Sequence, residues 1–194
     1  MDELTMGSQE IDGNFRAVLA VVKAAHFAAQ KHAGQRRKGA AAEPYINHLL
    51  EVAELVSSAL AEPDIDLVIA ALLHDTVEDT GVTKQVLVET FGSDVADLVM
   101  EMTDDKSLPK AERKRLQIVH ASQISVRAQV IKLADKISNL RGILASPPAD
   151  WSVERKREYF DWAKRVVDGL SAPNQILKAE FERLYRQVES LSSS

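Results

Sequence analysis

The sequence predicts an all-α protein that folds as a single domain. Only 8 glycines and 6 prolines occur among 194 residues, and runs of β-branched residues are short. Apolar residues recur instead at the three- and four-residue spacing of a helix face. A chain of this length can bury a sizeable core. We expect one domain over residues 13–191, between a flexible tail at 1–12 and a short tail at 192–194.

The first two expected helices flank a basic loop. Apolar residues at helical spacing predict a helix over 15–31. The stretch GQRRKGAAAEP, residues 34–44, is rich in Gly and Ala and ends at a proline, which predicts a loop. A second helix is expected over about 46–60, with His48 in its first turn and Leu50 among its inward-facing residues.

Caps and turn-forming residues divide the rest of the chain into further helices. Asp64 is the expected cap of a central helix whose region ends at Gly81, and Ser125 caps the helix that carries VIKLADKISNL. The remaining helices are expected over 83–91, 93–102, 109–122, 153–170 and 173–191. The two C-terminal helices are amphipathic and could pack on the core or on a partner.

Composition excludes several classes of function. The formal charge of −5 argues against a general nucleic-acid-binding surface, although it leaves room for a small basic pocket. The absence of cysteine rules out disulfides, thiolate nucleophiles and Cys-type zinc sites. The acidic N-terminus has no apolar core of a signal peptide, and no apolar stretch approaches the ~20 residues that span a bilayer. We therefore expect a cytoplasmic protein without membrane or nucleic-acid partners.

Polar residues cluster at the end of the apolar run VIAALLHDTVED, residues 68–79. On a continuous helix, positions four apart share a face, so His74 would lie with Glu78 and Asp75 with Asp79. An imidazole and three carboxyl groups at the end of a buried element are costly unless something pairs with them. A divalent metal with its water would do so.

Two further residues strengthen the prediction of a metal. A single His near a helix start, such as His48, is more often a surface or core residue, and a lone Asp such as Asp135 usually caps or pairs with a lysine. Together with His74 and Asp75, however, they supply two imidazoles and two carboxylates from three helices. Mixed N and O donors suit Mn, Fe or Zn better than Ca, and leave positions for water.

Five stretches in this order resemble the hydrolase domain of RelA/SpoT proteins, within the HD-domain phosphohydrolase superfamily. They are HAGQRRK (32–38), EPYINH (43–48), ALLHDTVEDT (71–80), ERKRLQ (112–117) and KLADKISNLR (132–141). The C-terminal half, with EYFDWAKRVVDGL (158–170), is most similar to the stand-alone members, which are the metazoan SpoT homologues and the bacterial small alarmone hydrolases. Two departures are Leu49, where family members often have proline, and a loop before Tyr45 that is two residues longer than in the long proteins.

The resemblance implies an HD-domain helical bundle with a Mn²⁺ ion. The implied ligands are His48, His74, Asp75 and Asp135. Glu78 and Asp79 are implied to organise the attacking water, and we favour Glu78 as the base because it shares the expected face of His74. The implied reaction removes the 3′-pyrophosphate of (p)ppGpp, giving GDP or GTP and pyrophosphate.

The same resemblance implies the substrate contacts. Arg37 is expected near the base and Lys38 at a phosphate, and Lys110, Asn139 and Tyr159 match substrate-contacting positions. Arg36, Lys114 and Arg115 are interpreted as solvated charges. His26, His32 and His120 match no ligand position, and His32 is expected to close the first helix.

Three functions remain open from the sequence. The first is alarmone hydrolysis without synthetase activity, because we find no room for the additional nucleotide-transferring domain of the long family members. The second is an HD-domain phosphatase that acts on another phosphorylated nucleotide such as NADPH. The third is a nucleotide-binding module without turnover, which the complete set of ligands and carboxylates disfavours.

Overall fold

The structure confirms the all-α class. The computed structural model describes the backbone of residues 3–190 and the side chains of residues 13–189. Over these residues it is built from helices joined by turns, with an isolated β-bridge between Arg36 and Pro44. The helices are α1 (Glu3–Lys31), α2 (Ile46–Ala59), α3 (Ile65–Leu73), α4 (Thr76–Thr80), α5 (Lys84–Phe91), α6 (Ser93–Met102), α7 (Lys110–Val119), α8 (Val126–Ala145), α9 (Val153–Asp168), α10 (Gln175–Tyr185) and the 3₁₀ turn η1 (Arg186–Ser190).

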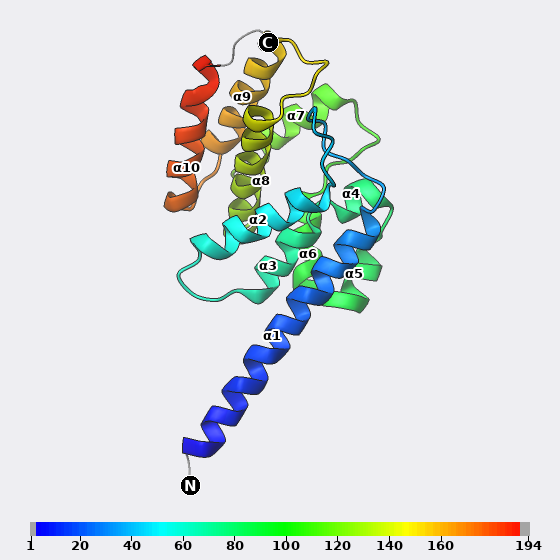
Figure 1. Cartoon of the computed structure of the whole chain (residues 1–194), viewed down its shortest axis with the longest axis vertical. Helices are drawn as coiled ribbons and strands as arrows, with labels where there is room; N and C mark the ends of the chain where they lie inside the picture. The colour runs from blue at the N-terminus through cyan, green and yellow to red at the C-terminus, as the bar shows by residue number, and fades with distance from the viewer. Residues whose placement is uncertain (1–2, 191–194) are drawn as a thin grey trace.

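Helix α8 lies at the centre of the bundle (Figure 1). It contacts α2, α3, α6, α9 and α10, while α3 also packs against α1 and α2. Its expected inward residues are fully buried, namely Ile131, Leu133, Ala134, Ile137 and Leu140. The side chains that α8 directs toward α2 and the end of α3 are therefore held by a rigid, buried element.

Side-chain caps fix where several helices begin. Asp64 and Ser125 accept hydrogen bonds from the backbone N–H groups of Leu67 and Ala128, as the sequence predicts. Thr83, Ser152 and Asn174 cap α5, α9 and α10 in the same way. Gly81 ends α4 with a φ of 75°, a conformation that glycine adopts without strain.

One expectation for the N-terminal half is corrected. The backbone of α1 begins at Glu3, within the segment 1–12 that is expected as a tail, while residues 1–2 and the expected tail at 192–194 lie outside the described residues. Leu50 is 46% exposed, because the buried stripe of α2 follows Leu49, Val52 and Val56 instead.

The expected central helix is broken where its polar residues begin. Helix α3 ends at Leu73, α4 begins at Thr76, and Asp75 has φ −98° and ψ −2°. Asp79 N–H still donates to the Asp75 carbonyl, so these two residues stay one turn apart. The break means that His74 and Glu78 are not stacked on one continuous helix, which removes the helix-face reason for favouring Glu78 as a base.

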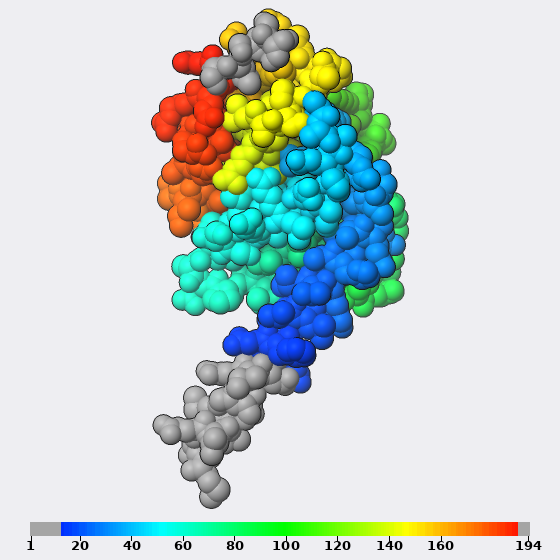
Figure 2. Space-filling view, in the orientation of Figure 1, coloured from blue at the N-terminus to red at the C-terminus, as the bar shows by residue number. Residues whose placement is uncertain are grey.

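The basic loop folds back on itself and rests on the end of α8. Arg37 N–H donates to the Glu43 carbonyl, and Ala41 N–H donates to Ser146 Oγ over 2.9 Å. A Cβ atom at Gly39 would lie 2.3 Å from the Ser146 carbonyl oxygen, so only glycine allows this approach. Figure 2 shows the loop pressed against the segment after α8.

The described part of the chain contains no helix that is both long and apolar enough to cross a membrane.

We predict that the negatively charged carboxylate of Glu180 stabilises the contact between α10 and α8, and that its protonation in acid abolishes this effect. Its carboxylate accepts hydrogen bonds from Arg183 and Arg141, both at 2.7 Å, and these lower its pKa from 4.5 to about 2. A carboxyl group whose pKa is lowered by folding stabilises the folded state at pH values above its ordinary pKa of 4.5. This stabilisation is lost as the pH falls toward 2. Glu180→Gln should cost about 1 kcal/mol of unfolding free energy at neutral pH, given its partial exposure.

Denaturant unfolding at neutral and strongly acidic pH measures this difference. In acid the variant and the natural protein should have the same stability. Glu62→Gln, which changes an exposed carboxyl group, is the control. An equal loss of stability at both pH values would contradict the electrostatic explanation.

Candidate active site

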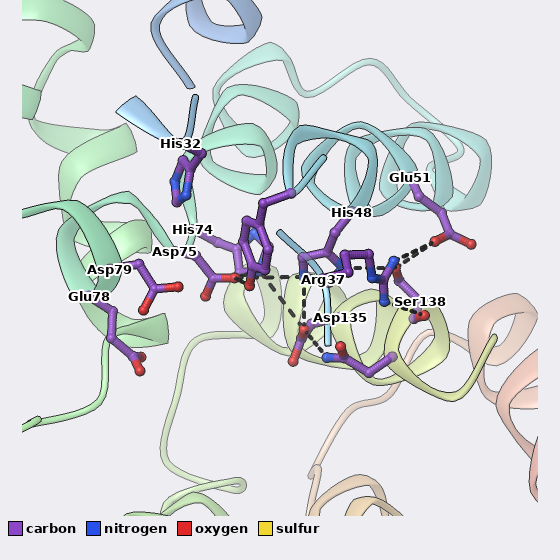
Figure 3. Close-up of polar contacts among 12 residues, drawn as sticks. His32, Arg37, His48, Glu51, His74, Asp75, Glu78, Asp79, Asp135 and Ser138 are labelled. Carbon is purple, nitrogen blue, oxygen red and sulfur yellow. Dashed lines mark hydrogen bonds and ion pairs between the residues drawn. The ribbon is translucent and has the colours of Figure 1, made fainter. Parts of the chain in front are cut away.

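The four predicted metal ligands converge on one point from separate helices (Figure 3). His48 lies on α2, Asp135 on α8, and His74 and Asp75 at the junction of α3 and α4. His48 Nε2 lies 3.4 Å from Asp135 Oδ1 and 3.6 Å from Asp75 Oδ2. His74 Nε2 lies 3.9 Å and 3.1 Å from the same two oxygens.

Both histidines turn Nε2 toward this cluster because their other ring nitrogen is engaged. His74 Nδ1 donates to the Ala71 carbonyl, and His48 Nδ1 lies 2.8 Å from Ser138 Oγ. His74 Nε2 is buried and has no hydrogen-bond partner among the described residues, which is rare for a buried nitrogen. Within the described residues, ligand atoms of His48, His74 and Asp135 lie within 4.8 Å of one another, and Asp75 adjoins this group. Two imidazoles and carboxylates at such spacing fit a divalent first-row metal.

The charges in the cluster stabilise one another. Burial alone would lower the pKa of His74, but the carboxylates of Asp75 and Asp135 outweigh it and raise that pKa to about 9. Burial alone would raise the pKa of each aspartate. Nearby positive charge outweighs it in both, led by His74 for Asp75 and by Lys136 for Asp135, and each pKa falls below its ordinary value. The aspartates are therefore carboxylates, the form that ligates metal.

Residues next to the predicted ligands hold the two aspartates in place. Tyr45 Oη donates to Asp75 Oδ2 over 2.6 Å. Asp135 accepts from Lys136 Nζ at Oδ2 and from Asn139 Nδ2 at Oδ1, over 2.9 and 2.6 Å. These roles of Tyr45 and Lys136 are not among the expectations from the sequence, although both residues lie within the stretches EPYINH and KLADKISNLR that carry predicted ligands.

Glu78 and Asp79 lie beside the cluster in different surroundings. Glu78 Oε2 accepts from the Asp104 N–H over 3.0 Å, and Oε1 lies 3.5 Å from Arg113 Nη1. Burial raises the pKa of Glu78, and the charge of Asp75 adds to the rise. Asp79 is held at both oxygens, by Gln35 Nε2 over 2.7 Å and by an ion pair with Lys106.

A cleft of about 850 Å³ opens next to these carboxylates. All five predicted substrate contacts line it, namely Arg37, Lys38, Lys110, Asn139 and Tyr159. Burial, reinforced by the positive charge of Lys38, lowers the pKa of Lys110, so these two cations lie close enough to feel each other. The cleft therefore offers clustered positive charge opposite an acidic centre.

The far wall of the cleft is aromatic, and it corrects one expectation. Tyr159 packs between Trp151 and Trp162, with ring centroids 5.6 and 5.2 Å away. Lys114 is not a solvated charge, because its Nζ lies 4.5 Å from the Trp162 ring centroid and the residue lines the cleft. Arg115 is exposed as expected.

Comparisons with known proteins agree with this arrangement. A family model described as "HD domain" matches residues 24–161. A Xenopus tropicalis protein named guanosine-3′,5′-bis(diphosphate) 3′-pyrophosphohydrolase MESH1 is 48% identical over 85% of this chain and 92% of its own length. The Homo sapiens protein of that name is 47% identical over 86% and 93%. A solved structure, described as a metazoan ortholog of SpoT that hydrolyzes ppGpp, matches with a TM-score of 0.84 and 45% identity over 89% of this chain and 97% of its own.

We predict that His74→Ala abolishes metal binding, because it removes a buried Nε2 ligand atom and two of the contacts that hold the cluster together. Elemental analysis of protein loaded with Mn²⁺ and then desalted should give about one ion per natural chain and almost none in the variant. His26→Ala, which changes an exposed histidine of α1, should keep its metal. Full retention of metal by His74→Ala would refute the ligand assignment.

Proposed function

Because the chain belongs to the HD-domain family, and within it to the guanosine-3′,5′-bis(diphosphate) 3′-pyrophosphohydrolases, we propose that it degrades (p)ppGpp. It hydrolyses the 3′-pyrophosphate and leaves GDP or GTP and pyrophosphate. The observation that carries this function is the convergence of His48, His74, Asp75 and Asp135 beside a cleft lined with cations.

The cluster is suited to Mn²⁺, which we propose as the cofactor. His48, His74, Asp75 and Asp135 would hold the ion, which when bound supplies a Lewis acid for a phosphoryl oxygen and makes water more acidic. Carboxylate and imidazole donors are compatible with Mn²⁺, and the set contains no thiolate that would favour softer metals.

We assign the proton transfer to Glu78 and the orientation of water to Asp79. The raised pKa of Glu78 brings its carboxyl group closer to neutral pH, where a base can accept a proton from water efficiently. Asp79 is less free to exchange a proton, since Gln35 and Lys106 occupy its two oxygens. In the reaction, water attacks the phosphorus that carries the 3′ oxygen and its proton passes to Glu78. The bond between that phosphorus and the 3′ oxygen breaks, and the 3′ oxygen takes a proton from solvent.

The cleft supplies the contacts that a highly anionic nucleotide needs in an acidic protein. Lys38 and Lys110 are proposed to bind phosphate, where each charge-assisted hydrogen bond contributes about 1.5–3 kcal/mol. Arg37, Asn139 and Tyr159 are proposed to position the nucleoside. The ring of Tyr159 belongs to an aromatic wall on which a base can stack.

The direct test incubates the purified protein with ppGpp, pppGpp or NADPH, with and without Mn²⁺, and identifies the products. We expect pyrophosphate with GDP or GTP only when metal is present. Release of phosphate from NADPH with no cleavage of ppGpp would instead support a phosphatase for another nucleotide. Binding of nucleotide without turnover would support a module without catalysis.

Glu78→Gln should separate catalysis from metal binding. Loss of a general base lowers kcat by about 10²–10⁴-fold, while the four metal ligands are unchanged. Steady-state rates and metal content are measured together, and Glu89→Gln on α5 serves as a control for removal of an acidic charge. A near-normal kcat in Glu78→Gln would exclude its role as base.

A further inference from the structure

We propose that Ser138 and Glu51 form a positioning pair. The pair orients two residues at once, the metal ligand His48 and the substrate-binding residue Arg37. Neither residue touches the cleft or the predicted ion directly. Ser138 lies on α8 and is fully buried, and Glu51 lies on α2 one turn after His48. This inference rests on the proposed function for the role of Arg37, and on the geometry of the cluster for that of His48.

The hydrogen bonds around Ser138 define the direction of each proton. Ser138 Oγ donates to Glu51 Oε2 over 2.6 Å, because a carboxylate can only accept. Its lone pairs are therefore directed to His48 Nδ1, 2.8 Å away, which must act as the donor. With the proton fixed on Nδ1, Nε2 keeps its lone pair for the metal cluster. Glu51 thus selects the ligating tautomer of a histidine that it does not contact.

The same two residues hold the guanidinium of Arg37 (Figure 3). Arg37 Nη1 donates to Ser138 Oγ over 3.3 Å, and Nη2 donates to the Ser138 carbonyl over 3.1 Å. Arg37 Nη1 also lies 3.6 Å from Glu51 Oε2. Ser138 Oγ therefore uses its single proton and both lone pairs, and it joins the metal side of the site to the substrate side.

Two contacts explain why this arrangement is stable. Arg141 pairs with the second oxygen of Glu51 over 3.1 Å, so the carboxylate is fixed from both sides. Gly142 leaves room for Arg37, because a Cβ atom there would lie 2.6 Å from Arg37 Nη2. Since the neighbour is the end of a flexible side chain, an alanine at 142 would move Arg37 and leave the backbone in place.

The metal side is tested by calorimetric titration of the metal-free protein with Mn²⁺, in the absence of nucleotide. Ser138→Ala and Glu51→Ala should each weaken Mn²⁺ binding about 10–100-fold, the usual effect of losing an outer partner of a ligating histidine. Glu54→Ala removes an exposed carboxylate from the next turn of α2 and should leave the affinity unchanged. Spectra of ¹⁵N-labelled histidine in alkaline buffer should show His48 protonated at Nδ1 in the natural protein and partly at Nε2 in both variants.

The substrate side is tested by Gly142→Ala, which displaces Arg37 without touching His48. We expect its KM for ppGpp to rise about tenfold, the effect of one lost charge-assisted hydrogen bond, with kcat and Mn²⁺ affinity retained. Ser138→Ala should show both defects, a raised KM and weakened Mn²⁺ binding. The two variants together distinguish a shared positioning pair from a residue that serves only the metal or only the substrate.

The outcomes separate this inference from the proposed function. If Glu51→Ala keeps natural Mn²⁺ affinity and the Nδ1 tautomer of His48, the positioning pair is wrong even when ppGpp is hydrolysed normally. If the metal and tautomer effects appear but the natural protein does not cleave ppGpp, the pair stands for His48 and the proposed substrate is wrong. Where Glu51→Ala fails to fold, Glu51→Gln replaces it and should raise the KM for ppGpp through the lost ion pair with Arg37.

Discussion

Two aspartates beside two buried imidazole rings are the arrangement on which the rest of the structure depends. Removing these groups from water costs free energy, and the cost is offset only if each charge faces an opposite charge or a donor. The distances of 3.1 to 3.9 Å between the histidine nitrogens and the carboxylate oxygens meet that condition. The helices must therefore bring three separated segments together with little tolerance, which explains the rigid, fully buried face of α8.

The residues around the site give each carboxylate a different set of hydrogen-bond donors. Asp75 and Asp135 each have a donor that is not a histidine, Tyr45 in one case and Lys136 in the other. Asp79 is held at both oxygens, whereas Glu78 keeps one oxygen clear of close hydrogen bonds. Neighbouring carboxylates with similar chemistry thereby lie in different surroundings, which is the basis of the different roles proposed for them as ligands, orienting group and base.

The sequence predicts the fold class and most helix positions because caps and apolar spacing are local signals. It also predicts the members of the candidate site, since the stretches around His48, His74 and Asp135 carry a strong family resemblance. The break at His74–Asp75 was not predictable from spacing, because apolar periodicity continues up to it. Lys114, Ser138 and Glu51 were missed for a different reason. Lys114 lies 48 residues from its partner Trp162, and Ser138 lies 87 and 90 residues from Glu51 and His48, so only the packing of α2, α7, α8 and α9 brings them together.

The close approach at Gly39 has a consequence for how this molecule can diverge. The loop that carries Arg37 and Lys38 is docked on the backbone at Ser146, with no space for a single methyl group between them. A larger side chain at position 39 would displace both cations from the cleft unless the segment after α8 moved as well. Because the nearest atom is the backbone carbonyl oxygen of Ser146, no substitution at position 146 alone makes room, and a larger residue at position 39 requires the backbone after α8 to move.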